Sequence, residues 1–429
     1  MKKLIPLLLL LPLGVGQAAD LIQLYEQALD SDPVLRGARS TRESAQELRP
    51  QALAPLLPQV DLAASVDRIN MDDRDNGTVK GADLRLRQPI LRFDQWIRLD
   101  QSKDVIEQAG AQYSQEEINL IVRVAQTYFG ILAAEDNLSF SQAEMRAISR
   151  QLDQAKQRFD VGLIAITDVH EVQAAYDQAR ANVIVATNDL DSAWEALREI
   201  VANLEERKLL GLRSKIPMSK PNPANIEEWI NLAMERSPQV LAANSGLSAS
   251  RKQIELERSG HLPSLDLVAG SSINSSTSPF IGNDNDTNSI GLQLSLPLYA
   301  GGSVSSRTRQ ARHDFVTASE GLEQARRAVR RDVSDYYRGV LSSISKVAAL
   351  ESAIRSAQSA LEATQAGFDV GTRTMVDVLT VQRNLFKARA DYSNARYQYI
   401  LNGLGLKATA GIISIDDLRL VNGLLQGRS

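Results

Sequence analysis

The chain contains no cysteine and only three histidines among 429 residues. Without cysteine it has no disulfide framework, no iron–sulfur cluster and no thiolate zinc site, and no cysteine that could carry an N-terminal lipid anchor. His170, His261 and His313 have no companions at metal-ligand spacing, so isolated surface positions are expected for them. No metal and no cofactor is predicted.

An excess of positive charge is also absent. The 48 Lys+Arg and 52 Asp+Glu leave a formal charge of −4, whereas nucleic-acid binding normally requires a basic patch or stripe. No GxSxG, Walker or GxGxxG pattern occurs, and Gly301-Gly302 lacks the Lys-Ser/Thr that completes a phosphate loop. The sequence therefore predicts no nucleic-acid partner, no catalytic residue and no enzyme. Hydrophobic residues at 43% still indicate a folded chain.

The one extended apolar run lies at the N-terminus. Lys2-Lys3, an apolar stretch over 4–15 and Gly16-Gln17-Ala18 have the order of a secretory signal peptide, predicted at 1–18 with cleavage after Ala18 or Ala19. The apolar stretch is too short for a membrane-spanning helix, and no run of 18 apolar residues follows it. The sequence predicts an exported protein without a transmembrane helix.

The rest of the chain repeats itself at an offset of about 205 to 209 residues. The clearest match is Phe159-Asp160-Val161-Gly162 against Phe368-Asp369-Val370-Gly371. This period is far longer than a solenoid repeat, so we predict a duplicated, domain-sized unit. The predicted organisation is repeat 1 at 19–204, a linker or equatorial segment at 205–225, repeat 2 at 226–408 and a C-terminal equatorial segment at 409–429.

Each repeat has the same succession of local signals. A helix is expected behind Asp32-Pro33 and behind Ser237-Pro238, because a polar residue followed by proline favours a helix start. Alternating apolar and polar residues then predict two strands in each repeat: about 58–70 and 80–91 in repeat 1, and about 263–274 and 288–299 in repeat 2. The Asn/Asp/Gly/Ser-rich stretches between the paired strands are expected to be exposed loops.

A very long helical region closes each repeat. Residues 93–159 and 303–368 contain no proline, and their apolar residues follow coiled-coil spacing. Each helix would span roughly 100 Å and would be followed by a returning helix, giving hairpins over about 93–203 and 303–405. The predicted fold is mixed α+β, mainly α, and elongated.

Four strands cannot close a barrel on their own. Each strand of about ten residues can cross a bilayer, and in lipid a sheet must close because open edges leave unpaired amides. Two chains would give a filled eight-stranded barrel, and three would give twelve strands with room for a lumen. The sequence predicts an obligate oligomer that shares one barrel.

Five motifs carry a resemblance to a known family. They lie at 56–59 (LLPQ), 262–267 (LPSLDL), 296–302 (LPLYAGG), 158–169 (RFDVGLIAITDV) and 370–379 (VGTRTMVDVL). The chain resembles the TolC family of Gram-negative outer-membrane efflux proteins over nearly its whole mature length. The resemblance implies a homotrimer with a twelve-stranded outer-membrane barrel continued by an α-helical barrel across the periplasm. It implies a passive exit duct for drugs, toxic compounds and secreted proteins, opened by a periplasmic adaptor and an inner-membrane RND, ABC or MFS pump.

The same resemblance assigns roles to residues at the hairpin tips. Arg373 would link to Thr167 and Asp168 on a neighbouring hairpin, with Gln151 as a further polar partner. Asp377 from three chains would form a carboxylate ring at the constriction, favouring cations and raising some of its own pKa values. The turns that reverse the hairpins and receive the adaptor would be Gly162, Leu163, Gly371 and Thr372.

Two positions depart from the family's best-known member. Phe368 stands where that member has a gate tyrosine, and Thr380 stands where it has a second constriction aspartate. We therefore expect a closed tip with fewer hydrogen bonds and a less negative constriction. Asp377 has a second interpretation as a residue that favours the helix macrodipole, and Asp168 occupies the equivalent place in repeat 1.

A structural or adhesive trimeric coiled-coil protein of the outer membrane is the alternative function. Such adhesins usually have one membrane-anchoring segment at the C-terminus. Here the predicted strands lie in the middle of each repeat and the helices return to the starting side, which favours the duct. The sequence does not indicate which pumps, adaptors and cargoes are used.

Overall fold

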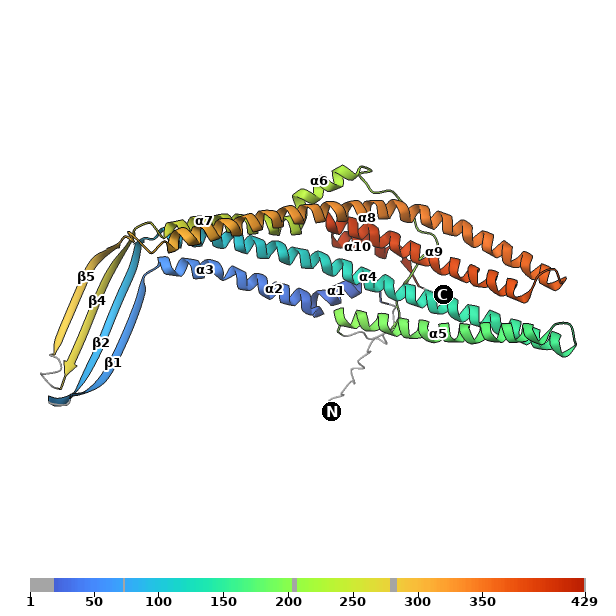
Figure 1. The fold of residues 1–429 in the computed structure, drawn as a ribbon, viewed down its shortest axis with the longest axis horizontal. Helices are drawn as coiled ribbons and strands as arrows, with labels where there is room; N and C mark the ends of the chain where they lie inside the picture. The colour runs from blue at the N-terminus through green and yellow to red at the C-terminus, as the bar shows by residue number, and fades with distance from the viewer. Residues whose placement is uncertain (1–18, 72–73, 203–206, 278–283, 428–429) are drawn as a thin grey trace, which may run out of the picture. The chain divides into compact units, whose positions relative to one another are not determined.

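The computed structural model describes residues 19–71, 74–202, 207–277 and 284–427, so the predicted signal peptide at 1–18 lies outside the described residues. The described chain is mainly helical and contains one four-stranded sheet (Figure 1). The elements of its first half are α1 (Leu21–Ser31), α2 (Pro33–Gln46), α3 (Leu48–Leu53), η1 (Ala54–Leu56), β1 (Gln59–Met71), β2 (Arg74–Leu91), α4 (Phe93–Asp160) and α5 (Ile166–Ile200).

The second half follows nearly the same order of elements. After a short strand, two helices stand in place of α1–α3 and η1, and they are followed by two strands, one very long helix and a returning helix. The elements are β3 (Gly211–Leu212), α6 (Ile226–Arg236), α7 (Pro238–Ser259), β4 (Ser264–Ser276), β5 (Asn285–Ser295), α8 (Ser303–Asp369), α9 (Met375–Thr409), α10 (Ile415–Asn422) and β6 (Leu425–Gln426).

The chain forms two compact units. The sheet unit comprises Gly37–Gln115 and Pro238–Ala328, and the hairpin unit comprises the chain up to Arg36, Glu116–Ser237 and the chain from Val329 onward. The four long strands belong to the sheet unit, and both helical hairpins turn within the hairpin unit.

The sheet is fully antiparallel in the order β1-β2-β4-β5, so β1 and β5 are its edges. Its register places apolar side chains of all four strands on one face. Val60 pairs with Leu86, which pairs with Ala269, which pairs with Ile290. Many large apolar side chains of this face are exposed, among them Val60, Leu62, Val66, Leu84, Ile273, Ile290, Leu292 and Leu294. The other face carries polar and small residues such as Asp61, Arg85, Gly270 and Ser289.

Polar contacts join α7 to the first turns of α4 in the sheet unit. The Lys252 ammonium forms ion pairs with the carboxylates of Asp100 and Asp104, with N···O distances of 2.8 and 2.9 Å. The hydrogen bonds from Lys252 and Lys103 lower the pKa of Asp100. Gln101 Nε2 donates to the Ala249 carbonyl oxygen at 2.9 Å. These contacts fix α7 against α4 without a large apolar core.

The hairpin unit is held by a conventional core. Residues that coiled-coil spacing predicts on one face of α4 are fully buried, including Ala125, Tyr128 and Leu132. Tyr128 donates its hydroxyl proton to the Leu210 carbonyl, and Tyr397 donates to the Asp136 carboxylate, both at 2.7 Å. Buried tyrosines of this kind need such a partner for the hydroxyl group. The segments expected at 205–225 and 409–429 meet in the two-stranded β3–β6 ladder.

Short helices at the edges of the repeats were not individually recognisable from the periodicity. α1 begins with a capping box in which Asp20 accepts from the Gln23 amide at 2.8 Å. α10 begins with Ser414 and Asp417, whose carboxylate accepts from the Ser414 amide at 3.0 Å. Both starts carry the capping pattern of a helix N-terminus, which is the signal that could have located these helices.

The strand boundaries differ from those expected. β2 begins at Arg74 rather than near 80, and Thr78 and Gly77 pair with Arg68 and Ile69. Main-chain pairing overrides the weak strand propensity of this Asn/Gly-rich stretch. β5 covers Asn285–Ser295 rather than 288–299. The strand ends before Pro297, which has no N–H to donate to a ladder.

Candidate functional site: the two hairpin tips

The two hairpins reverse direction through equivalent turns. Gly162 and Gly371 have φ angles of 76° and 80°, a conformation that costs residues with a Cβ atom about 1 kcal/mol or more. The Leu163 amide donates to the Arg158 carbonyl, and the Thr372 amide donates to the Gly367 carbonyl, both at 2.8 Å. This 6→1 bond is the mark of a Schellman helix end. The sequence match at these tips thus reflects one shared turn geometry.

The second tip, between α8 and α9, has a complete capping box. The Asp377 carboxylate accepts from the Thr374 amide at 3.0 Å and from the Thr374 hydroxyl at 2.9 Å. The Thr374 hydroxyl oxygen in turn accepts from the Asp377 amide at 3.2 Å. These hydrogen bonds lower the pKa of Asp377, with a smaller contribution from the nearby charge of Arg373. Asp377 therefore lies in the first turn of α9, three residues after the capping residue Thr374, where a carboxylate interacts favourably with the helix macrodipole.

The first tip, between α4 and α5, has only half of this arrangement. Its helix-capping position is Ala165, which has no side-chain acceptor for the α5 amides. The Asp168 carboxylate still accepts from the Ala165 amide, at 3.3 Å. The two tips therefore share a backbone path but differ in how firmly the returning helix is capped.

A compact apolar cluster lies behind both tips. It contains residues of α4, α5 and α9, so it joins the first hairpin to the second. Its buried members are Ile148, Leu152, Ala155, Val169, Val172, Ala179, Met375, Val378 and Leu379, and Phe368 is half-buried against them. Phe368 thus contributes packing at the position where the family's best-known member has a tyrosine.

Arg158 links the two tips through polar contacts. Its guanidinium donates to the Asp369 carboxylate at 3.0 Å, and its Cζ atom lies 4.9 Å from the centroid of the Phe368 ring. Sequence reasoning quoted Arg158 and Asp369 only as parts of motifs and gave them no role. Their positions beside the turn glycines were the available signal, but residues 211 positions apart could not be paired without the fold.

Gln151 takes part in a second link between the hairpins. Its Nε2 atom donates to Gln382 Oε1 at 2.6 Å, and Gln382 is buried. Within the described part of the chain, Gln151 Oε1 and Gln382 Nε2 are buried without a partner. A buried amide with an unmade hydrogen bond is costly, so this pair stabilises the contact less than a fully bonded pair would.

Other predicted tip residues do not meet within one chain. Among the described residues, Arg373 has no ion-pair partner, and no hydrogen bond joins it to Thr167 or Asp168. Its aliphatic stem lies against Gly367, where an added Cβ atom would come within 2.8 Å of Arg373 Cγ. Leu163, Thr372 and Thr380 are exposed. The predicted link of Arg373 to a neighbouring hairpin stays a prediction.

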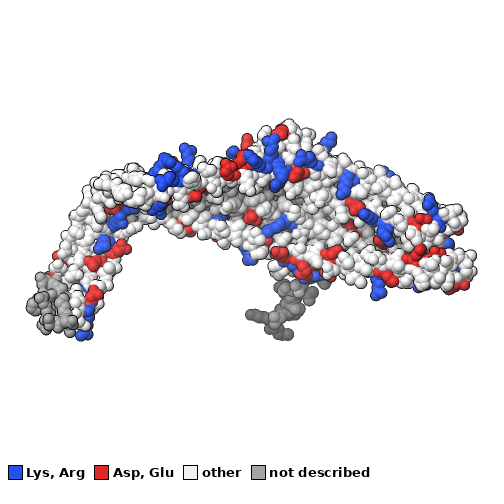
Figure 2. All heavy atoms as spheres, in the orientation of Figure 1, with Lys and Arg blue, Asp and Glu red and all other residues white. Residues whose placement is uncertain are grey.

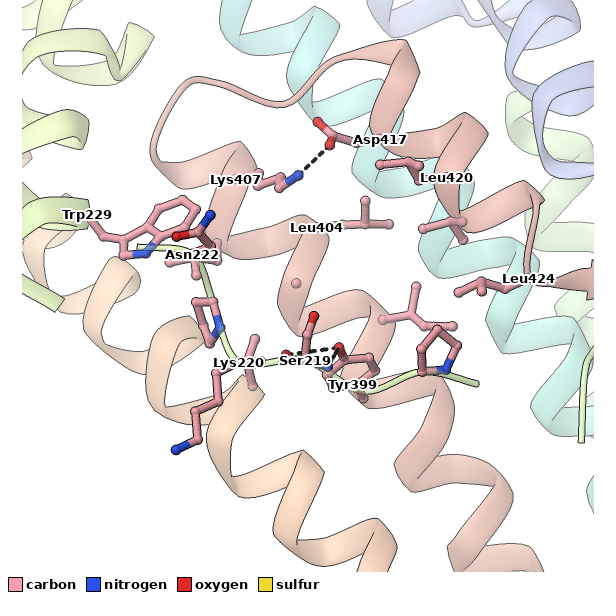
Figure 3. Close-up of a pocket in the computed structure, with 17 residues that line it drawn as sticks. Ser219, Lys220, Asn222, Trp229, Tyr399, Leu404, Lys407, Asp417, Leu420 and Leu424 are labelled. Carbon is pink, nitrogen blue, oxygen red and sulfur yellow. Dashed lines mark hydrogen bonds and ion pairs between the residues drawn. The ribbon is translucent and has the colours of Figure 1, made fainter. Parts of the chain in front are cut away.

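A separate pocket lies elsewhere in the hairpin unit, between the segment 217–222 and helices α6, α9 and α10 (Figure 3). Trp229, Leu404 and Leu424 form its apolar wall, and Lys407 pairs with Asp417 at 2.5 Å beside them. Tyr399 bonds to the main chain of Ser219. These groups hold the segment 217–222 against the helices. The pocket is therefore accounted for by the packing of this segment, and we assign no ligand to it.

The visible surface has charges of both signs. Figure 2 shows Lys and Arg beside Asp and Glu over the helices, without a continuous basic stripe on that face. In the described residues no cluster of His, Asp and Glu is arranged to hold a metal ion. No described helix combines the length and the hydropathy needed to cross a bilayer.

The geometry can now be compared with known proteins. The family model for outer membrane efflux proteins matches residues 24–203 and 229–411. The chain is 40% identical to the outer membrane protein TolC of Vibrio cholerae, with 99% of each chain covered. It is 28% identical to the alkaline protease secretion protein AprF of Pseudomonas aeruginosa, over 94% of this chain and 87% of that protein.

A solved structure agrees with the fold. The CmeC outer membrane channel of Campylobacter jejuni superposes with a TM-score of 0.80 at 16% identity, over 94% of this chain and 89% of that one. These relatives are channels of the Gram-negative outer membrane rather than enzymes. The chain therefore belongs to the outer membrane efflux protein family, as a TolC-like exit duct of the outer membrane for efflux and type I secretion.

Proposed function

We propose that three copies of the chain form the working duct by sharing one twelve-stranded barrel. The observation that carries this proposal is the four-stranded sheet, which exposes an apolar face and has open edges at β1 and β5. In lipid such edges would leave main-chain amides unpaired, and only closure with other copies removes them. Three copies supply twelve strands, enough to enclose a lumen.

The helical hairpins of the three copies would continue the duct through the periplasm as an α-helical barrel. The two hairpins of one chain already share the apolar cluster behind their tips. We attribute their likeness to duplication of one ancestral unit. The recurring element order and the separate match of the family model to each half support this origin.

The tips would form the gate of the duct. Asp377 from three copies would line the constriction as a ring of ionised carboxylates that favours cations. Thr380 lies one turn further along α9 and is neutral, so no second ring of carboxylates would follow the first. Arg373 would donate to Thr167 and Asp168 of a neighbouring hairpin. A charge-assisted bond of this kind is strong, yet a partner that docks at the tip can replace it.

The docking partners would be a periplasmic adaptor and, through it, an inner-membrane pump. Exposed apolar residues at the tips support this assignment: Val161 and Leu163 at the first tip and Val370 at the second are each at least 70% exposed. One isolated apolar residue is ordinary on a protein surface, whereas several neighbouring ones mark an interaction site. The cargo would include toxic compounds, and secreted proteins as in the protease secretion named for the Pseudomonas relative.

Engineered cysteines test the gate directly, because the chain contains no cysteine of its own. In the Asp168→Cys/Arg373→Cys variant, mild oxidation should produce a covalent trimer that dissociates when a reducing agent is added. Cells that lack their own exit duct should regain resistance to dyes and detergents with the reduced protein and lose it on oxidation. The matched control is Asp177→Cys/Arg373→Cys, which should give no covalent trimer.

Two results would count against the proposal. A covalent dimer as the largest product would exclude three copies around one axis. Unchanged sensitivity of the cells with a correctly inserted wild-type protein would exclude the exit duct and favour a structural or adhesive role.

A further inference from the structure

We infer that the lipid-facing side of the sheet carries a binding site for the headgroup phosphates of a glycolipid in the outer leaflet. The site consists of Arg68 on β1 and Lys80 on β2. This inference rests on the proposed shared barrel, because the barrel is what turns the apolar face of the sheet toward lipid.

The register puts both cations on the apolar face. Val66 pairs with Lys80 and Arg68 pairs with Thr78, so both cations share the face of Val60, Leu62 and Leu84. Arg68 and Lys80 are therefore diagonal neighbours on adjacent strands, and such residues lie roughly 7 Å apart. One phosphate group can accept from two cations at that separation, since both side chains are long and flexible.

Neither cation is neutralised within the described residues. Both side chains are exposed, and no described side chain forms an ion pair with either of them. Their cross-strand neighbours Thr78, Val66 and Ser275 are neutral. Asp286 on the same face lies on β5, so β4 separates it from Lys80. The Asp284 carboxylate, also beyond β4, accepts from the Ser276 amide at 2.8 Å. The sequence has further aspartates between β1 and β2, Asp72 and Asp73, which lie outside the described residues. Measurements of the trimer without glycolipid separate their effect from that of lipid.

The depth of the cations along the sheet agrees with a headgroup position. From Leu265 to Ser275, the partner of Lys80, the strand advances ten residues, or about 34 Å. With a strand tilt of about 40° this is about 26 Å along the bilayer normal, close to the ~25 Å apolar band of outer-membrane barrels. Arg68 and Lys80 therefore lie where hydrocarbon gives way to phosphate.

The opposite boundary of the band is built from different residues. Phe93 and Trp96 follow β2, Tyr299 follows β5, and all three side chains are exposed. Aromatic residues are typical of a membrane–water interface. The helices continue from this end of the sheet, so it faces the periplasm, and the cations at the far end face the outer leaflet. The outer leaflet of this membrane is rich in phosphorylated glycolipid, the occupant to which we assign the site.

The test compares lipid retained by the purified full-length trimer, counted by native mass spectrometry. The probes are a glycolipid with two phosphorylated glucosamine units and its dephosphorylated form, each mixed into phosphatidylcholine vesicles. Wild type should retain the phosphorylated form in preference. Arg68→Gln/Lys80→Gln should lower this retention about fivefold for each cation removed. The control Arg326→Gln/Arg327→Gln removes the same charge from exposed positions of α8 and should leave retention unchanged.

Single-channel conductance in phosphatidylcholine bilayers distinguishes a failure of the headgroup site from a failure of the proposed duct. Equal retention of both glycolipids by a conducting wild-type trimer would overturn the headgroup site and leave the duct intact. Absence of both trimer and conductance in wild type would overturn the duct, and the headgroup site with it. If the double variant destabilises the trimer equally without glycolipid, the cations bind protein carboxylates instead, and the inference is wrong.

Discussion

The two hairpin tips share a backbone but carry different chemistry. Both end their long helix at a left-handed glycine, and both begin the returning helix with an aspartate three residues after the capping position. The first tip has Ala165 at the cap and Ile164 before it, whereas the second has Thr374 and Arg373 at the equivalent places. The first tip thus has the Thr167 hydroxyl and the Asp168 carboxylate as acceptors, and the second has the Arg373 guanidinium, which forms no ion pair within the described part of the chain.

This difference suggests a division of roles between the tips. In the capping box the Asp377 carboxylate accepts two hydrogen bonds from Thr374, which lower its pKa, as suits the place at the constriction that we propose for it. Asp168 accepts one main-chain hydrogen bond at 3.3 Å, which leaves it able to accept further donors. Arg158 of the first tip already meets Asp369 of the second within one chain, and the proposed link of Arg373 to Asp168 would repeat such a contact between neighbouring copies.

Loss of Arg373 should have the largest effect on the closed state. Arg373→Ala removes the proposed charge-assisted bond, about 1.5–3 kcal/mol in each copy, so the open fraction should rise at least tenfold. Single-channel conductance measures it. Asp168→Ala should open the tip to a similar extent, and the double variant should add little because the two residues share one bond. If the single and double variants both leave the channel shut, the latch assignment is wrong.

Loss of the Arg158 contacts should have a smaller effect. Arg158→Gln removes an exposed ion pair to Asp369 and a stacking contact with Phe368, together about 1 kcal/mol. We expect about a fivefold rise in the open fraction. This rise should be smaller at high salt, because salt screens exposed charges. Arg355→Gln, which breaks an i,i+4 pair with Glu351 on one helix, is the matched control. An equal effect from both variants would rule out a specific link between the tips.

Making the first tip resemble the second should stabilise it locally. Ala165→Thr supplies the missing capping hydroxyl and should add about 1 kcal/mol. Hydrogen exchange of the α5 amides nearest to the cap should slow by about fivefold, while the amides of the α9 cap should exchange as before. Unchanged exchange at α5 would mean that the tips differ by more than the capping residue.

The smallest effect concerns the titration of Asp377. Hydrogen bonds from Thr374 lower the pKa of Asp377 in the folded state below the ordinary 3.8. The carboxylate therefore stabilises the folded state at pH values above 3.8, and this stabilisation is lost as the pH falls through the lowered pKa. Thr374→Val removes the hydroxyl but keeps the amide, so the pKa should rise. Cation selectivity, measured as reversal potential against pH, should then decline at a higher pH than in wild type. An identical titration in wild type and Thr374→Val would exclude the Thr374 hydroxyl as the cause of the lowered pKa of Asp377.

Much of the fold could be predicted because its signals are long. The proline-free coiled-coil pattern locates α4 and α8, whose observed bounds are Phe93–Asp160 and Ser303–Asp369. Apolar alternation indicates all four strands, but not that β2 reaches back to Arg74, because ladder hydrogen bonds there do not depend on side-chain pattern.

The site was less accessible to sequence reasoning. Gly162 and Gly371 were recognisable because positive φ selects glycine. The Arg158–Asp369 and Gln151–Gln382 contacts were not, since they join residues more than 200 positions apart that only the packing of two hairpins brings together. A contact expected between copies, such as that of Arg373 with Thr167 and Asp168, is one that a single chain does not contain.

The most direct test of the account is the ion selectivity of the purified trimer in planar bilayers, wild type against Asp377→Ala, with Asp177→Ala as the matched control, because Asp177 is an exposed acid of α5 outside the proposed gate. We predict a cation-selective pore that loses most of its selectivity in Asp377→Ala and keeps it in Asp177→Ala. Selectivity that does not change in Asp377→Ala would contradict the carboxylate ring at the second tip and would place the constriction elsewhere in the duct.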